Sequence, residues 1–98
     1  GIHRVMKKAL AQITNGTDYV HVSFDLDSVD PTVAPGVGTP VKGGLDYREA
    51  HLIMELLCDA RVMSSLEMVE VNPILDERNR SAEFAVELVE SAFGKRIL

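Results

Sequence analysis

Apolar residues recur with two different periods along the chain, and each period predicts a different kind of element. Residues 2 to 13 show helical spacing, and Asn15 and Gly16 then tolerate the left-handed conformation of a helix end. In "YVHVSFD", residues 19 to 25, apolar and polar side chains alternate as on a strand with one buried face, the apolar ones being Val20, Val22 and Phe24. The chain therefore begins with an amphipathic helix followed by a β-strand.

A stretch without either period follows in "SVDPTVAPGVGTPVKGG", residues 28 to 44. Its prolines remove backbone donors and its glycines permit unusual dihedral angles, so it predicts a long loop. Loops of this length in a compact domain are usually functional or disordered, and the prolines favour one stiff path over a flexible one. Helical spacing returns over residues 46 to 60, where Asp46 and Glu49 form a variant of the capping box.

The last third of the chain predicts another strand and another helix. "LEMVEVNP" is apolar and β-favouring, and the strand should end just before Pro73, which cannot donate to a ladder. A helical stripe follows, made of Ala82, Ala85, Val86, Val89 and Phe93. A strand, a crossover helix and a second strand give parallel pairing. We therefore expect one α/β domain over residues 1–98, with a parallel sheet and flanking helices in the order αβαβα.

Composition narrows the possible partners and surroundings. The chain has 98 residues, 46% of them apolar, and a net charge of −5 without a basic patch, so nucleic acid is not an expected partner. No apolar run approaches the roughly 20 residues that cross a bilayer, so no membrane partner is expected. The single Cys58 excludes an internal disulfide, and a reducing, cytoplasmic location is expected. Because the chain opens on Gly1 and its first residues already read as helix, a piece of a longer protein is also expected.

Three acidic residues fall where the two predicted strands end. Asp25 and Asp27 close the first strand and Glu70 lies near the end of the second, and ligands of open parallel sheets bind beyond these carboxyl ends. Two residues of an extended segment that are two positions apart point the same way, so both aspartates could meet one divalent cation. An aspartate that caps the following turn is the alternative. For Glu70, a structural salt bridge and a site for a cationic ligand remain equally open.

Other kinds of site are not supported by their spacing. Counted from Asp25, an EF-hand loop would require glycine at Asp30 and glutamate at Gly36. Neither phosphate-binding glycine motif fits the loop, and the three histidines lie on separate elements without metal-ligand spacing. No serine or cysteine has a nucleophile context, so covalent catalysis is not indicated.

The motifs "SFDLDSVDP", "GVGTP" and "EMVEVNPILDERN" together resemble the carboxyl-terminal third of arginases, which are ureohydrolases with a binuclear manganese centre. The resemblance implies a three-layer arginase-like fold, here partial. It also implies that Asp25 and Asp27 are metal ligands, that Gly38, Thr39 and Pro40 line the active site with Thr39 binding substrate, and that Glu70 pairs with the substrate guanidinium. Agmatinases share the first motif, but the asparagine in "EVNP" favours L-arginine, cleaved to urea and ornithine.

The resemblance also implies that this chain lacks some of the metal ligands of arginases. In arginases the remaining metal ligands come from a histidine segment and a D-x-H-x-D segment upstream, and neither occurs in this sequence. We therefore expect the chain alone to bind Mn²⁺ weakly or not at all and to be inactive. A homo-oligomer is expected, since arginases commonly form trimers or hexamers and the segment from Tyr47 to Glu49 resembles one that contributes to their subunit contacts. A helical turn that faces solvent is the alternative for this segment. The alternative is a non-catalytic module that associates with itself.

Overall fold

The computed structural model describes all 98 residues and contains three α-helices, two β-strands and one short 3₁₀ turn. In chain order the elements are α1 (Ile2–Ile13), β1 (Val20–Asp25), η1 (Leu26–Ser28), α2 (Tyr47–Ala60), β2 (Met63–Val69) and α3 (Arg80–Ala92). The strands pair in parallel, which confirms the predicted α/β class. None of the three helices has the length and apolar character needed to span a membrane.

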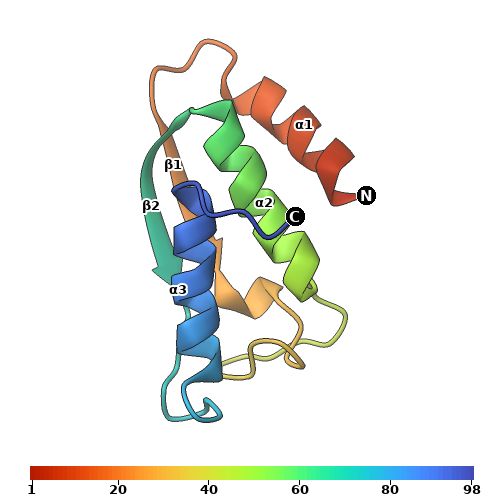
Figure 1. Ribbon diagram of the computed structural model, residues 1–98, viewed down its shortest axis with the longest axis vertical. Helices are drawn as coiled ribbons and strands as arrows, with labels where there is room; N and C mark the ends of the chain where they lie inside the picture. The colour runs from red at the N-terminus through yellow and green to blue at the C-terminus, as the bar shows by residue number, and fades with distance from the viewer.

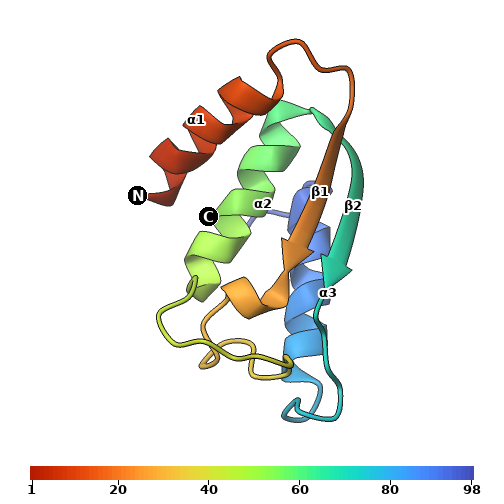
Figure 2. The same ribbon diagram turned by 180° about the vertical axis from the view of Figure 1, so that it is seen from behind.

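The sheet has one apolar and one polar face. Figures 1 and 2 show the helices gathered on one side of the two strands, with α1 lying along α2. The side chains of Val22 and Phe24 face this helical side and join the core. On the opposite face, His21 hydrogen-bonds to Ser65 at 2.6 Å and lies 3.3 Å from the carboxylate of Glu67. The predicted alternation of apolar and polar side chains along the first strand is thus confirmed. The chain consists of this sheet and one layer of helices.

The long loop is part of the hydrophobic core. Three of its apolar side chains are at most 1% exposed and pack with those of α2 and α3, these three being Val29, Ala34 and Val37. Asp30 fixes the loop at two points, since its carboxylate accepts hydrogen bonds from the backbone of Thr32 and Gly43, both at 2.9 Å. These bonds, the one from Thr32 foremost, lower the pKa of Asp30. The loop therefore follows one defined path, as its prolines predicted.

The element boundaries agree with the sequence at the helix starts and differ at the second strand. Asp46 caps α2, and Asp46 and Glu49 exchange both bonds of the predicted capping box. The second strand begins earlier than its apolar run suggested, at Met63, and ends at Val69. It ends there because Glu70 adopts a left-handed backbone conformation that no ladder can accommodate.

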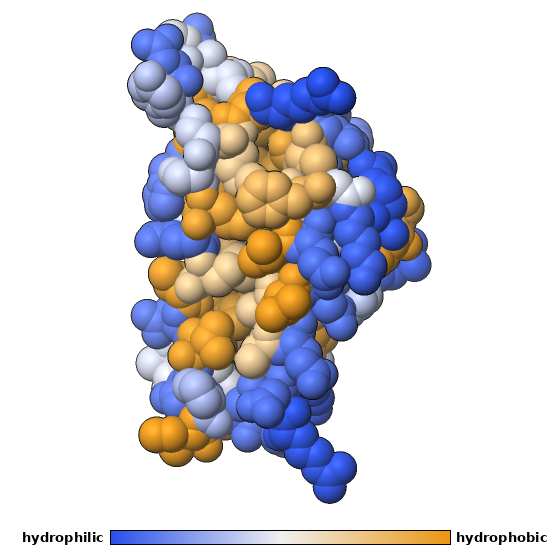
Figure 3. Space-filling model, turned by 60° about the vertical axis from the view of Figure 1, so that its left-hand side comes forward, coloured by the Kyte–Doolittle hydropathy of each residue, from blue (hydrophilic) through white to orange (hydrophobic).

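The apolar stripe expected on α3 is divided between two surfaces. The buried side chains of the helix are centred on Phe84, Ala85 and Leu88, whereas Val86 and Phe93 are 61% and 73% exposed. Val86 and Phe93 belong to a mainly apolar groove beside the neighbouring strand, lined by Met68, Ala85, Val86, Val89, Glu90 and Phe93. Figure 3 shows the band of apolar side chains on this side of the molecule. We call the groove formed by these residues the β2–α3 groove.

Candidate functional site

The register of the two strands brings the predicted acidic residues to one edge. Asp25 is the last residue of β1 and lies opposite Val69, the last residue of β2. Glu70 therefore begins the next turn at the same carboxyl edge, although forty-five positions separate it from Asp25 in the sequence. This is the edge at which ligands bind in open parallel sheets.

Asp25 and Asp27 do not lie in one extended segment, so the expectation based on strand geometry is wrong. The strand ends at Asp25, and the next three residues form the turn η1. Oδ1 of Asp25 accepts a hydrogen bond from the backbone N–H of Asp27 at 2.9 Å, so Asp25 also acts as the turn cap that was the alternative. Its Oδ2 takes part in none of the hydrogen bonds of the chain, and a metal ion could use it. Capping and ligation are therefore compatible.

The glycine-rich loop returns to the acidic edge at Thr39. Its hydroxyl donates a hydrogen bond to Oδ2 of Asp27 at 3.1 Å, across twelve positions of sequence. Both Thr39 and its neighbour Gly38 are exposed. The structure thus brings the predicted substrate-binding threonine against one of the two predicted metal ligands.

Glu70 is one of four non-glycine residues with a left-handed backbone conformation, the others being Arg61, Arg78 and Asn79. Its φ is +71°, a conformation that costs a non-glycine residue about 1–2 kcal/mol. Its side chain is exposed and takes part in none of the six ion pairs of the chain. The structural salt bridge considered for Glu70 is therefore absent. A strained residue whose side chain stabilises nothing is typical of a functional position.

The acidic edge supplies only part of a metal site. Nowhere in the chain do three or more histidine, cysteine, aspartate or glutamate side chains converge as metal ligands. The carboxylate oxygens of Asp25 and Asp27 are suitable donors for a hard or borderline divalent ion such as Mn²⁺. The donor set therefore fits manganese in kind and falls short of it in number.

Three residues for which the sequence predicted no role hold the loop beside this edge, namely Gly36, Asp76 and Ser81. Gly36 donates a backbone hydrogen bond to the buried hydroxyl of Ser81 at 2.7 Å, and the carboxylate of Asp76 accepts from the backbone N–H of Ser81 at 2.9 Å. An aspartate shortly before a helix is a capping signal, and it could have indicated Asp76. The pairing with Gly36 has no counterpart in the local sequence.

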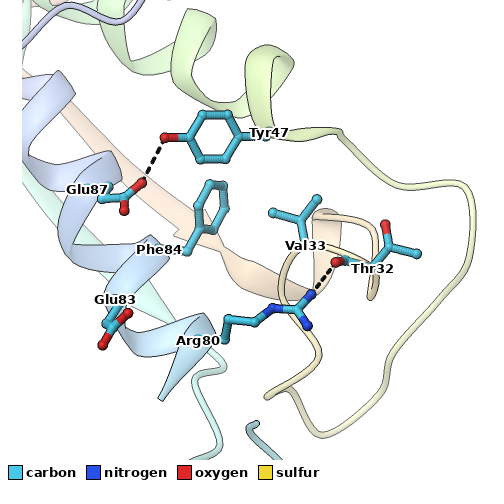
Figure 4. A pocket seen from close by; sticks show the side chains of 7 residues that line it. All are labelled: Thr32, Val33, Tyr47, Arg80, Glu83, Phe84 and Glu87. Atoms are coloured by element: carbon cyan, nitrogen blue, oxygen red, sulfur yellow. Dashed lines mark hydrogen bonds between the residues drawn. The ribbon is translucent and has the colours of Figure 1, made fainter. Parts of the chain in front are cut away.

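One cavity of the chain lies between α2 and α3, apart from the acidic edge. It has a volume of about 300 Å³, and Figure 4 shows Tyr47 of α2 reaching to Glu87 of α3 at one side and Arg80 reaching to the backbone of Thr32 at the other. None of the acidic residues at the carboxyl edge lines it. We therefore assign the candidate site by the register and contacts of its residues.

His51 lies in the interface of α2 and α3 near this cavity. Its imidazole is 1% exposed, and Nδ1 hydrogen-bonds to the hydroxyl of Ser91 at 2.8 Å. Burial lowers the pKa of His51, although Glu87, whose carboxylate lies 3.7 Å from Nε2, acts in the opposite direction. The histidine is thus a core residue, and it is remote in sequence from the acidic edge.

A two-stranded parallel sheet with acidic side chains at its carboxyl edge, and a glycine-rich loop that contacts Asp27, defines an α/β protein with a candidate ligand site at this edge. The chain belongs to the arginase family, whose model matches residues 1–94. It is 56% identical to an arginase of Bacillus caldovelox and 54% identical to one of Bacillus subtilis, over all of its 98 residues. It spans about a third of the length of these relatives, 33% in both cases.

Solved structures agree with this assignment. The crystal structures of the arginases from Bacillus subtilis and Bacillus caldovelox superpose on the whole chain with TM-scores of 0.95, and the chain covers 36% and 33% of them. A formimidoylglutamase from Bacillus subtilis is 28% identical over 95% of the chain, with a TM-score of 0.89, and the chain covers 29% of it. The fold is therefore shared by enzymes named for different substrates, and it does not by itself determine the substrate.

Proposed function

We propose that this chain is the part of an arginase that carries two metal-ligand aspartates, Asp25 and Asp27, and the guanidinium-binding Glu70. The observation that carries the proposal is the strand register. It brings the two aspartates and the strained, unpaired glutamate to one edge of the sheet. A cationic ligand at this edge would give all three carboxylates a partner, which none of them has in an ion pair within the chain.

Each residue has a distinct task in hydrolysis of L-arginine to L-ornithine and urea. Asp25 and Asp27 would hold manganese, which when bound supplies a water molecule of lowered pKa next to the substrate. Thr39 would bind the substrate, and its hydroxyl, which donates a hydrogen bond to Oδ2 of Asp27, lies beside the proposed metal ligands. Glu70 would accept charge-assisted hydrogen bonds from the guanidinium, and these are stronger than neutral ones.

L-arginine is the preferred substrate for two reasons. The relatives with 54% and 56% identity are named arginases, whereas a hypothetical agmatinase from Burkholderia thailandensis is only 29% identical. The sequence "EVNP" around Glu70 also has the arginase form. Agmatine or another guanidino compound is the alternative within the family, and turnover rates on the two substrates distinguish them.

The isolated chain should bind Mn²⁺ weakly and release no urea, because two aspartates do not complete a binuclear centre. Calorimetric titration with Mn²⁺ tests the ligands. Asp27→Asn should remove the binding, and the control Asp18→Asn, at an exposed residue before β1, should not. Equal binding by both variants would refute the role of Asp27, and appreciable urea release by the chain alone would refute the expected inactivity.

A chimera tests the function itself. In it, residues 1–98 replace the matching third of the Bacillus subtilis arginase, to which they are 54% identical. We expect the chimera to release urea from L-arginine in the presence of Mn²⁺, and Glu70→Gln to reduce kcat/KM by at least about a hundredfold, since a charged hydrogen-bonded partner contributes several kcal/mol. An active Glu70→Gln chimera would contradict the proposal.

The β2–α3 groove favours a second candidate, a module that associates with itself. Both strands have a free edge, since the sheet contains only these two, and unpaired edges promote association. Sedimentation at several concentrations tests this. Phe93→Ser, in the groove, should weaken association, whereas Tyr19→Ser, which is 83% exposed outside the groove, should not. A strictly monomeric chain would exclude this candidate.

A further inference from the structure

The two segments that carry Thr39 and Glu70 are joined through Gly36. The backbone N–H of Asn72, two residues after Glu70, donates to the carbonyl oxygen of Gly36 at 2.7 Å. The N–H of Gly36, three residues before Thr39, donates to the hydroxyl of Ser81 at 2.7 Å. Gly36 is thus bound on both sides, and both partners belong to the part of the chain that follows β2.

Asp76 fixes the position of Ser81. Its carboxylate accepts hydrogen bonds from the backbone N–H groups of Ser81 at 2.9 Å and Ala82 at 3.2 Å. These bonds replace the missing cap of α3, because the N-cap residue Asn79 makes no side-chain bond to the helix. Burial acts to raise the pKa of Asp76, but the hydrogen bonds from Ser81 and Ala82 hold this pKa below its ordinary value. The ionised carboxylate also suits the positive end of the helix dipole.

Gly36 and Asp76 are in direct contact. A Cβ atom at Gly36 would lie 2.6 Å from the side chain of Asp76, so only glycine allows this approach. Ser81 and Gly36 are both buried, and the serine hydroxyl is the acceptor for the Gly36 N–H. We call these three residues the Gly36 clamp.

We propose that Ser81 and Asp76 are positioning residues, which hold Thr39 and Glu70 in the relative arrangement that guanidinium binding requires. The inference rests on the proposed function. Neither residue is a predicted ligand of substrate or metal, and both act through Gly36. Loosening the clamp separates the loop that bears Thr39 from the turn that bears Glu70. Asp25 and Asp27 stay at the end of β1. The effect should therefore fall mainly on KM and much less on kcat.

Amide hydrogen exchange in the full chain tests the clamp without any activity. Ser81→Ala leaves the buried N–H of Gly36 without its acceptor, and we expect exchange at Gly36 and Asn72 to become faster by on the order of tenfold. Asp76→Asn should act in the same direction. The matched control is Ser91→Ala, because Ser91 is also buried on α3 and hydrogen-bonds a core residue, His51. This control should leave the amides of Gly36 and Asn72 unchanged.

Kinetics of the chimera test the link to the substrate. Ser81→Ala should raise KM for L-arginine several-fold while kcat changes by less than about twofold, and Ser91→Ala should change neither. Unchanged exchange at both amides in Ser81→Ala would overturn the clamp, as would equal effects of Ser81→Ala and Ser91→Ala on exchange and KM. If the unaltered chimera released no urea, the proposed function would fail, whereas the exchange data would still decide whether the clamp exists.

Discussion

Replacing Glu70 with glycine should make the protein more stable while it abolishes guanidinium binding. The left-handed backbone at φ +71° costs glutamate about 1–2 kcal/mol, and glycine adopts it freely. Glycine loses about 0.5–1 kcal/mol more chain entropy on folding. The exposed Glu70 side chain makes no ion pair that would offset the gain. The net gain should be about 0.5–1 kcal/mol.

Thermal unfolding measures this gain. For a domain of 98 residues, the expected gain raises Tm by about 2–8 °C. Arg61→Gly is the matched control, because Arg61 is also exposed, has φ +55° and ends α2 away from the acidic edge. Both variants should gain stability to a similar extent. In the chimera, only Glu70→Gly should lose urea release.

Two results would refute this reasoning. A lower Tm for Glu70→Gly, together with a higher Tm for Arg61→Gly, would mean that the Glu70 carboxylate stabilises the fold. Full activity of the Glu70→Gly chimera would mean that the Glu70 carboxylate does not bind the substrate. In either case Glu70 would lose its place in the candidate site.

Two further predictions concern stability. The pKa of buried His51 lies below its ordinary value of 6.5, so its neutral form contributes stability that is fully present above pH 6.5 and is lost as the pH falls through the lowered pKa. The free energy of unfolding, measured with urea between about pH 7.5 and 5, should show this loss. His51→Gln should reduce the dependence of this free energy on pH, whereas His3→Gln, at an exposed residue, should not. An equal dependence on pH in both variants would contradict the assignment to His51. Gly36→Ala should destabilise by about 1–3 kcal/mol in thermal unfolding because its Cβ would overlap Asp76. Gly38→Ala, with open space around its Cβ, should change little, and a similar loss in both variants would argue against the close contact.

Local patterns predicted the elements, because helix caps and strand alternation depend on neighbouring residues. The capping box of Asp46 and the alternation around Val22 both appear in the structure as expected. The arrangement of Asp25 and Asp27 was predicted incorrectly because the chain does not stay extended beyond Asp25, where the Asp25 side chain caps the turn η1. Positive φ at a glutamate also opposes intrinsic preference, so propensity could not predict it.

Local sequence patterns could not predict the contacts between segments that are distant in sequence. The apolar stripe on α3 is continuous in sequence, yet only packing decides that Leu88 is buried and Val86 is exposed. The contact of Gly36 with Asp76 joins residues forty positions apart, and neither has a local neighbour that requires it. The resemblance to arginases provided the candidate residues at the acidic edge, and the strand register supplied their common location.

The polar outer face of the sheet limits how copies of this chain could aggregate. Stacking one sheet on another would bury His21, Ser65 and Glu67, whose desolvation is costly without new hydrogen-bonding partners. The two strand edges, by contrast, carry unpaired backbone N–H and C=O groups, which can form hydrogen bonds with a strand of another copy. Aggregates of the isolated chain should therefore grow as ribbons along the hydrogen-bonding direction, one sheet thick.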